Sequence, residues 1–375
     1  MNAFDLRSLR NSSISYQTVS IQAFAASCLA LAVLFDSAQA ADSIKLLPDR
    51  TEKGAAKQFN GQITSESPTE VKIKTTAGKE ETIPVSSIDT VTYDSLPPSF
   101  LRAESRLNAG AIAEAADLYG TAVTEAKGKV PIERAAMYGR AHALMELALV
   151  DQSKANDAAS ALEAFAKAHP TSRQIAPALT SLVQLRLSQG DLPKAEKAVA
   201  DLKAKLKYPP ELAKALDLAP VFEARILSKK GNNDDALKVL EGLLTTATQG
   251  SPASRAALLA KAECLAALKK FPEAEAAIKD VIAQAPPEDQ AIQAEAYNTL
   301  GDCLKAAGRP KDALMAYLKT DILYDGSKDQ HALALFQIVD LWRTLKQDGR
   351  ANDVQERLRQ TYPQSPYAKS KPATR

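Results

Sequence analysis

The residues whose side chains could do chemistry are few, and they stand far apart along the chain. Histidine occurs only at His142, His169 and His331. None of them has a second histidine or a cysteine three or four residues away, the spacing that places two metal ligands on one face of a helix. The sequence therefore predicts no metal site.

A pair of carboxylates, Asp234-Asp235, follows the turn Gly231-Asn232-Asn233. Acidic residues at the start of a helix cap its free N–H groups and complement its dipole, which is a structural role. The sequence contains neither a glycine-rich phosphate loop nor a Gly-x-Ser-x-Gly nucleophile turn. We therefore expect no catalytic residue, no cofactor and no enzymatic activity.

The composition is that of a soluble globular protein, with 45% hydrophobic and 25% charged residues. The net charge of +2 is spread along the 375 residues and forms no basic stripe. Nucleic-acid binding needs such a stripe, so no nucleic-acid partner is expected. Contact with a membrane is expected only through partners.

Residues 1–40 have the pattern of a signal peptide. Arg7 and Arg10 precede the apolar stretch 21–35, and Ala38-Gln39-Ala40 is a small-x-small cleavage signature. The stretch is shorter than the about 20 residues of a spanning helix. A lipoprotein signal around Cys28, a mitochondrial presequence and an uncleaved anchor remain alternatives. We expect export, with cleavage near Ala40/Ala41 and a periplasmic or secreted mature chain.

Residues 41–95 alternate between apolar and polar side chains, which is the period of half-buried strands. Turn residues separate the short runs, for example Ser67-Pro68 and Ala77-Gly78. The predicted core consists of Phe59, Ile63, Val71, Ile73, Ile83, Val85, Ile88 and Val91. The order of turns and strands resembles small SH3-like or Sm-like barrels, so four or five antiparallel strands are expected.

From residue 96 to 364 the period changes to that of helices, and a pair of helices recurs. The repeat is aligned on a small residue near the start of each second helix, at Ala115, Ala158, Ala195, Ala236, Ala274, Ala313 and Val354. The intervals are 37 to 43 residues. Glycines stand five positions earlier in five units, at Gly110, Gly190, Gly231, Gly308 and Gly349, and Lys269 takes this place in the fifth. A glycine there supplies the positive φ that ends the first helix.

The repeat unit resembles the tetratricopeptide repeat. The match is clearest at Tyr297, Leu300, Gly301, Leu304, Ala313 and Tyr317. Units of that family have 34 residues, so the longer spacing here implies longer loops. The resemblance implies a mainly α fold, a TPR-like α-solenoid of about seven helix pairs preceded by the small all-β module. In the last repeat Trp342 takes the place of the signature glycine, and residues 365–375 are expected to be a disordered tail.

Cys264 and Cys303 fall at the same position of two successive repeats. Equivalent positions of stacked helices lie roughly 10 Å apart, whereas a disulfide needs Cα atoms within about 7 Å. We expect two buried thiols, although an even pair in an exported chain leaves a disulfide as the alternative.

The resemblance implies a non-catalytic scaffold or adaptor that binds a protein segment in the concave groove. The chain endings around His169-Pro170 and Tyr362-Pro363 resemble those of exported bacterial envelope members. Groove residues expected from the register are Gln184, Arg225, Ser228, Glu263, Asn298, Asp302 and Lys305. Arg225 is the favoured anchor because a guanidinium binds a carboxylate through two bonds. The alternative is an envelope module whose β domain binds glycan or nucleic acid, with the repeats as a spacer.

Overall fold

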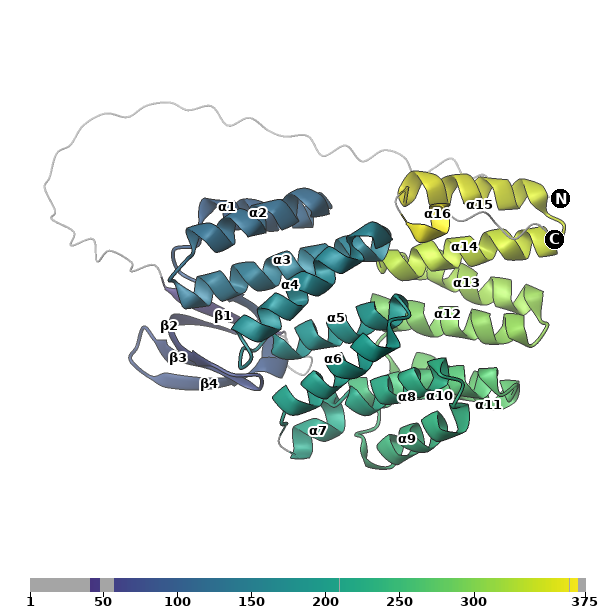
Figure 1. The fold of residues 1–375 in the computed structure, drawn as a ribbon, viewed down its shortest axis with the longest axis horizontal. Coiled ribbons are helices and arrows are strands. Elements are labelled where there is room, and N and C mark those ends of the chain that lie inside the picture. The colour runs from purple at the N-terminus through teal and green to yellow at the C-terminus, as the bar shows by residue number, and fades with distance from the viewer. Residues whose placement is uncertain (1–40, 48–56, 209, 364, 370–375) are drawn as a thin grey trace, which may run out of the picture. The chain divides into compact units, whose positions relative to one another are not determined.

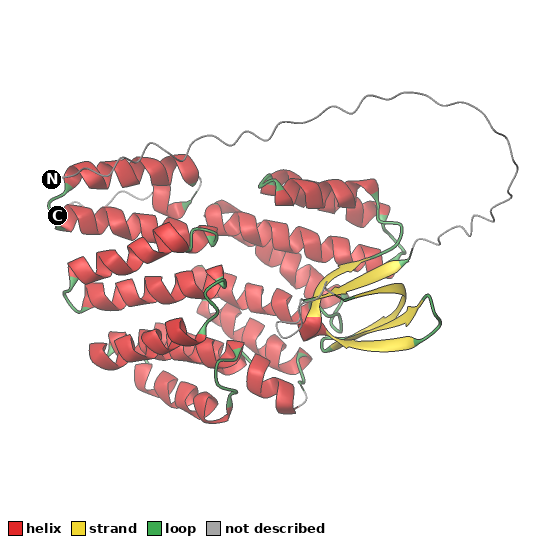
Figure 2. Cartoon of the chain, turned by 180° about the vertical axis from the view of Figure 1, so that it is seen from behind, coloured by secondary structure: helices red, strands yellow, loops and turns green. Residues whose placement is uncertain are grey.

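The computed structural model describes residues 41–47, 57–208, 210–363 and 365–369, which belong to one compact unit that begins at Ala40. The expected signal peptide, including Cys28, lies outside the described residues. Within the unit a small sheet is followed by helices to the end of the described chain (Figure 2). The fold class expected from the sequence is confirmed.

The sheet is a five-stranded antiparallel meander whose last strand returns beside the first. Its strands are β1 (Asp42–Leu46), β2 (Gln58–Glu66), β3 (Glu70–Thr75), β4 (Glu80–Pro84) and β5 (Ile88–Thr92), paired in the order β4-β3-β2-β1-β5. A 3₁₀ turn, Val85–Ser87, joins β4 to β5. The alternating side chains Ile44, Val71, Ile73 and Ile83 form the buried core of this sheet.

In the described residues the helices form seven antiparallel pairs. The first helix of each pair, called the A helix, is α1 (Pro98–Asn108), α3 (Val130–Val150), α5 (Ile175–Ser188), α8 (Ala219–Lys229), α10 (Pro252–Ala267), α12 (Gln290–Ala306) or α14 (Lys328–Thr344). The second, or B helix, is α2 (Ile112–Glu125), α4 (Ala155–Ala168), α6 (Leu192–Lys205), α9 (Asn233–Thr246), α11 (Phe271–Gln284), α13 (Pro310–Leu323) or α15 (Asp348–Thr361). Two short helices stand outside the pairs, α7 (Pro210–Leu216) and α16 (Pro366–Lys369) (Figure 1).

Each B helix begins three residues before an alanine that is fully buried. A larger side chain at this point would hold the A and B helices apart, because the backbones approach most closely there. Six A helices are followed, two residues after their last residue, by a residue with positive φ, which stands five positions before that alanine. In the fifth pair this residue is Lys269, with φ of 60°, so the turn geometry forms even without glycine.

The predicted register is wrong for the seventh pair. The fully buried alanine of α15 is Ala351, three residues after the helix begins, whereas Val354 is only half-buried. The residue with positive φ is accordingly Lys346 (φ 59°) and not Gly349, which lies inside α15. The sequence misled the prediction because glycine is the usual residue at such a turn, so Gly349 was chosen instead of Lys346.

This shift also moves the position of the signature glycine. Gly301 stands twelve residues before Ala313, and the matching residue before Ala351 is Val339, which is buried. Trp342 is instead half-buried, and the guanidinium carbon of Arg350 lies 4.7 Å from its ring centroid. Trp342 is therefore a side chain at the α14–α15 turn and does not replace the glycine.

In the sixth pair the glycine is required by close approach. A Cβ atom added to Gly301 would lie 2.6 Å from the ring of Tyr317, which is fully buried between α12 and α13. The Tyr317 hydroxyl donates a hydrogen bond of 2.6 Å to Asp302 Oδ1. The signature residues Gly301 and Tyr317 thus form one contact, in which the missing side chain makes room for the ring.

The sheet packs against the first helices. Tyr93, with partly buried Ile63 and Val91, packs with Phe100 and Tyr119, whose ring centroids are 5.3 Å apart in an edge-to-face arrangement. The sheet thus keeps the buried core described above, and Ile63 and Val91 also pack against the core of the first helices.

The last helices contact an early one. Helices α14 and α3 touch, and Lys369 Nζ lies 4.0 Å from Asp151 Oδ1, directly after α3. The tail expected to be disordered from residue 365 begins instead with α16, where the Tyr367 ring lies 5.6 Å from the Phe336 ring. Residues 370–375 lie outside the described chain.

Candidate functional site

The residues expected in the groove lie on successive A helices, and ion pairs connect them. Arg225 on α8 donates to Glu263 on α10 (3.4 Å) and to Glu295 on α12 (2.9 Å). The contact from α8 to α12 therefore spans the intervening helix pair, α10 and α11. Neighbouring A helices are therefore close enough at this surface for one guanidinium to bridge three of them.

The row continues towards the C-terminus. Lys305 on α12 donates to Gln337 Oε1 (2.8 Å) and pairs with Asp340 Oδ2 (2.7 Å), both on α14. Together with Asp302, these residues form what we call the A-helix row, namely Arg225, Glu263, Glu295, Asp302, Lys305 and Asp340. The row contains four carboxylates and two cations, so acidic groups are in excess.

The remaining expected groove residues differ in their exposure. Gln184 is exposed on α5, and Ser228 donates to Asn233 Oδ1 at 2.7 Å. Asn298 is buried, donating to Gln330 and accepting a hydrogen bond of 2.9 Å from Thr320. Asn298 therefore links α12 to α13 and α14, and its side chain has no surface to offer a partner.

The surroundings of the row affect its ionisation. Burial raises the pKa of Glu263; Arg225 opposes this rise and the neighbouring Glu295 adds to it. Burial likewise raises the pKa of Asp302, although the hydrogen bond from Tyr317 opposes it. The Glu263 side chain nevertheless keeps 43% of its surface exposed and that of Glu295 35%, so both carboxylates remain accessible.

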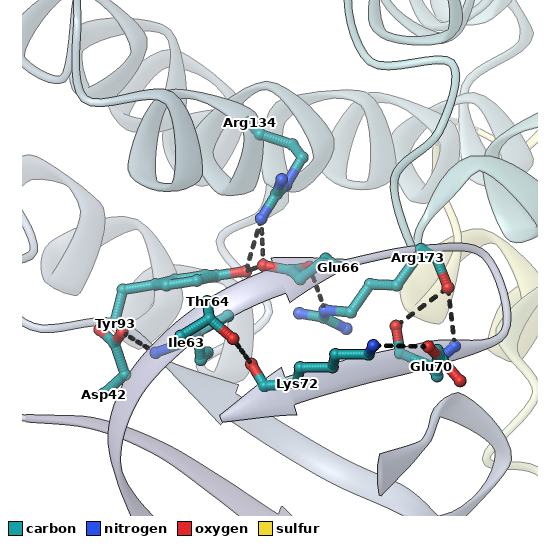
Figure 3. Close-up of polar contacts among 10 residues, drawn as sticks. Asp42, Ile63, Thr64, Glu66, Glu70, Lys72, Tyr93, Arg134 and Arg173 are labelled. Atoms are coloured by element: carbon teal, nitrogen blue, oxygen red, sulfur yellow. Dashed lines mark hydrogen bonds and ion pairs between the residues drawn. The ribbon is translucent and has the colours of Figure 1, made fainter. Parts of the chain in front are cut away.

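A second charge cluster joins the sheet to the helices, and the sequence analysis missed it (Figure 3). Glu66, at the end of β2, is ion-paired with Arg134 on α3 and with Arg173, whose Nε lies 3.2 Å from Glu66 Oε2. The hydroxyl of Tyr93 also donates to Glu66, at 2.5 Å. We call Glu66, Tyr93, Arg134 and Arg173 the junction cluster.

Little of the junction cluster is accessible to solvent. Only 2% of the Glu66 side chain is exposed, against 13% for Arg134 and 20% for Arg173. Burial and the negative charge of Glu66 raise the pKa of Tyr93, so its hydroxyl stays protonated and donates. No local pattern in the sequence indicates this cluster, because Glu66 and Arg173 are 107 positions apart. The two residues meet only when the end of β2 packs against the loop between α4 and α5.

His331 and the two described cysteines take structural places. His331 is buried between the Tyr362 hydroxyl (2.8 Å) and Asp321 Oδ1 (2.9 Å). Cys264 and Cys303 are free and buried, as expected, and burial raises the pKa of both thiols. Among the described residues no cluster of three or more His, Cys, Asp or Glu side chains could hold a metal ion. No helix in the same residues is long and apolar enough to span a membrane.

The sequence profile of the tetratricopeptide repeat matches residues 147–205 and 223–289. These segments run from the end of α3 to α6 and from α8 to α11, where helices pair and turn as described above. The chain contains tetratricopeptide repeats. The clearest signature, in 294–325, lies outside the matched residues, but its contact between Gly301 and Tyr317 has the close packing expected of such a repeat. Tetratricopeptide repeats are generally non-catalytic scaffolds for protein interaction.

Solved structures of other proteins resemble this one in fold. A tetratricopeptide repeat protein from Parabacteroides merdae is 14% identical, with a TM-score of 0.46 over 70% of this chain and 91% of its own. PilW, a type IV pilus biogenesis factor, is 17% identical, with a TM-score of 0.38 over 61% and 96%. IFIT1, solved as a monomeric mutant with m7Gppp-AAAA, is 13% identical, with a TM-score of 0.44 over 68% and 58%. Among curated proteins, none matches this chain in sequence.

Proposed function

We propose that this protein is a non-catalytic adaptor, exported to the bacterial cell envelope, whose A-helix row binds a segment of a partner protein. The repeats supply a series of similar helices, and stacked repeats of this kind present extended surfaces for protein recognition. The row itself is the observation that supports the proposal most directly. It is a set of charged, accessible side chains running along four A helices, α8, α10, α12 and α14, and a solvated surface of this kind favours a partner of complementary charge.

The balance of charge in the row specifies the partner further. Four carboxylates face two cations, and the two cations already have acidic partners inside the protein. A basic segment would pair with the excess carboxylates, whereas an acidic one would have to displace them from Arg225. The proposed partner therefore carries lysine or arginine in an extended or helical segment.

Crosslinking in living cells tests this proposal, with affinity purification of the tagged protein and mass spectrometry. We expect one dominant envelope protein, and its yield should fall at least about tenfold with Glu263→Lys, since a like charge now faces the basic segment. Glu273→Lys is the matched control, because it reverses an exposed acid on the B helix α11. Equal loss in both variants, or loss in neither, would contradict binding at the A-helix row.

Export has its own test. The mature protein should begin at Ala41 when it is recovered from the periplasm or the medium and its N-terminus is determined by mass spectrometry. Recovery of a chain that keeps residues 1–40, or one confined to the cytoplasm, would contradict the envelope location and leave the binding surface untouched.

The rival function, in which the sheet binds glycan or nucleic acid, gains little support from the charges of the sheet. Lys45, Lys72 and Lys79 are each ion-paired with an acid of the sheet. Paired lysines do not form the positive surface that a nucleic-acid backbone requires. Because Tyr93, Ile63 and Val91 pack against α1 and α2, deletion of residues 42–95 would disturb the helices, and point variants are the cleaner test.

A further inference from the structure

Helix α13 presents large apolar side chains to solvent. Of the six large hydrophobic residues that are exposed in the described chain, three lie on this B helix, with exposed fractions of 60% for Met315, 70% for Ile322 and 49% for Leu323. Met315 and Ile322 are seven residues apart, so two helical turns place them on one face. That face lies opposite the side that is buried through Ala313 and Tyr317. A surface helix normally carries polar residues at its outward centre.

The other B helices lack this feature. Met315 and Ile322 stand two and nine residues after Ala313, the buried alanine of α13. At the matching positions the other six B helices hold alanine, serine, threonine, glutamine, aspartate or lysine. The repeat itself therefore does not require a large apolar side chain at either position. Exposed apolar patches of this kind mark contact surfaces in many soluble proteins.

Helices α11 and α15 flank α13 on this surface. Arg309, directly before α13, pairs with Glu275 on α11 (2.8 Å), and Asp321 on α13 pairs with Arg357 on α15 (2.7 Å). We call the exposed side of these three helices the outer face. Each helix has 14 residues and is therefore about 21 Å long. With neighbouring helices about 10 Å apart, the outer face covers about 600 Å².

The charges of the outer face are divided between its centre and its flanks. On α13, Lys311 and Lys319 are exposed and have no ion pair among the described residues, whereas Asp312 is paired with Arg309. The flanks carry four exposed acids that likewise have no ion pair in the described chain, namely Glu273 and Asp280 on α11 and Asp353 and Glu356 on α15. The centre of the outer face is thus basic, and both flanks carry unpaired acids.

The basic residues of the flanks do not balance these acids. Three of them already contact groups inside the chain, namely Lys279 with Glu275, Arg350 with the ring of Trp342, and Arg357 with Asp321. Arg359 is two residues from Arg357, so it lies on the opposite side of α15, away from α13. An acidic partner or an anionic membrane would meet the four unpaired acids, and a basic partner would meet the two unpaired lysines.

We propose that the outer face binds the outer face of a second copy of this chain. Two copies related by a twofold axis bring the same surface together, so Met315, Ile322 and Leu323 are buried between them. The long lysine side chains of each centre then reach the acids on the flanks of the other copy. An apolar centre with a charged rim is the usual arrangement of a protein interface.

The size of the outer face predicts a reversible dimer. Its area is somewhat below the about 800 Å² per partner that a standard interface buries. The outer face consists of B helices and contains no residue of the A-helix row. Self-association is therefore independent of the proposed adaptor function.

Sedimentation equilibrium of purified residues 41–375 tests the proposal between about 1 and 200 µM, since the dimer fraction rises with concentration. We expect a mass that approaches two chains and returns to one chain on dilution. Met315→Ser together with Ile322→Ser should weaken association at least about tenfold, because the change removes the apolar centre. Leu101→Ser is the matched control, since Leu101 is 53% exposed and lies on α1. A single chain at every concentration, or equal loss in the control, would overturn the proposal.

Charge reversal tests whether the surface is complementary to itself. One variant carries Lys311→Glu and Lys319→Glu, and a second carries Asp280→Lys and Asp353→Lys. Each should associate with itself at least about tenfold more weakly than the wild type, because like charges now face each other. A mixture of the two should form a mixed dimer, since the reversed lysines of one meet the reversed aspartates of the other. A mixture that stays monomeric would contradict the pairing of centre with flanks.

Vesicles that contain phosphatidylglycerol test the alternative occupant, a membrane. Flotation should leave the wild type unbound, because unpaired acids flank the apolar centre. Binding that is lost with Met315→Ser and Ile322→Ser would assign the outer face to a membrane and overturn the proposal. All the substituted side chains are exposed, and circular dichroism of each variant separates loss of association from loss of fold.

Discussion

The junction cluster and the A-helix row use the same kinds of side chain in opposite ratios. At the junction one carboxylate, Glu66, meets two guanidiniums, whereas on the row one guanidinium, Arg225, meets two carboxylates. Their burial differs as well, because Glu66 is almost completely covered and Glu263 is 43% exposed. Water screens an exposed imbalance of charge and cannot reach a buried one.

This difference separates a structural contact from a binding surface. The buried cluster holds the sheet against α3 and the α4–α5 turn, and its charges cannot separate without a large loss of stability. The Glu263 and Glu295 carboxylates of the row reach water, so their ion pairs with Arg225 are individually weak. A partner can therefore exchange its own charges for those of the row at little cost, which suits a reversible adaptor.

The largest effect is expected from Glu66→Gln. This change leaves two guanidiniums without their carboxylate in a place that water barely reaches, and should cost about 3–5 kcal/mol of unfolding free energy in urea. Glu70→Gln, which alters an acid on β3 whose side chain is 45% exposed, is the control and should change stability by less than about 0.5 kcal/mol. Similar values for the two variants would mean that the junction cluster does not fasten the sheet.

An intermediate effect is expected from Arg225→Met on the row. Glu263 and Glu295 lose their shared cation, but both turn to water, so the loss should be about 1 kcal/mol in the same urea experiment. A loss as large as that of Glu66→Gln would show that the row is a buried structural cluster and would weaken the proposed binding role.

A smaller effect, with a distinct pH dependence, is expected from Glu263→Gln. At about pH 7.5 the stability should change by less than about 0.5 kcal/mol, because Arg225 keeps Glu295. The pKa of Glu263 is raised above its ordinary 4.5, so the folded protein takes up this proton more readily than the unfolded chain. The wild type should therefore gain stability relative to the variant as the pH falls through the raised pKa. Denaturation at about pH 7.5 and pH 5 measures the change, and the opposite sign would contradict the raised pKa.

The smallest effect is expected from salt. Raising NaCl from about 0.05 M to about 1 M shortens the screening length from over 10 Å to about 3 Å. The cost of Arg225→Met should shrink in high salt, whereas the cost of Glu66→Gln should stay nearly constant. Thermal denaturation of both variants at the two concentrations makes the comparison, and equal salt sensitivity would remove the distinction between the clusters.

The repeat was predictable because helix pairing leaves a periodic pattern. The buried alanines of the first six B helices lie where the sequence placed them, since the packing of one pair on the next demands a small residue at a fixed point. The prediction for the seventh B helix was wrong because it took Gly349 as the turn residue, whereas Lys346 adopts the positive φ of the turn. A local cue is reliable only where no other residue can adopt the same conformation.

The candidate sites were predictable to different degrees. Arg225 and Glu263 were expected on one surface because the repeat register sets which faces of successive A helices align. The repeat register does not give the distances between helices. It therefore could not predict the ion pair between Arg225 and Glu263, or the buried hydrogen bond from Asn298 to Gln330. A cavity beside Gln174 gave no sequence signal, since its lining comes from the sheet region and from helices α3, α5, α7 and α10.

By itself the sequence determined the secondary structure and the order of the repeats, because both follow from contacts between residues close along the chain. Apolar periods of two and of 3.6 residues leave only one side of each strand or helix to bury. Tertiary structure alone decided that the sheet packs against the first helices, that Glu66 meets Arg134 and Arg173, and that a cavity remains beside them. These contacts join residues far apart in the chain, and their charges are set by burial, which exists only once the elements have packed.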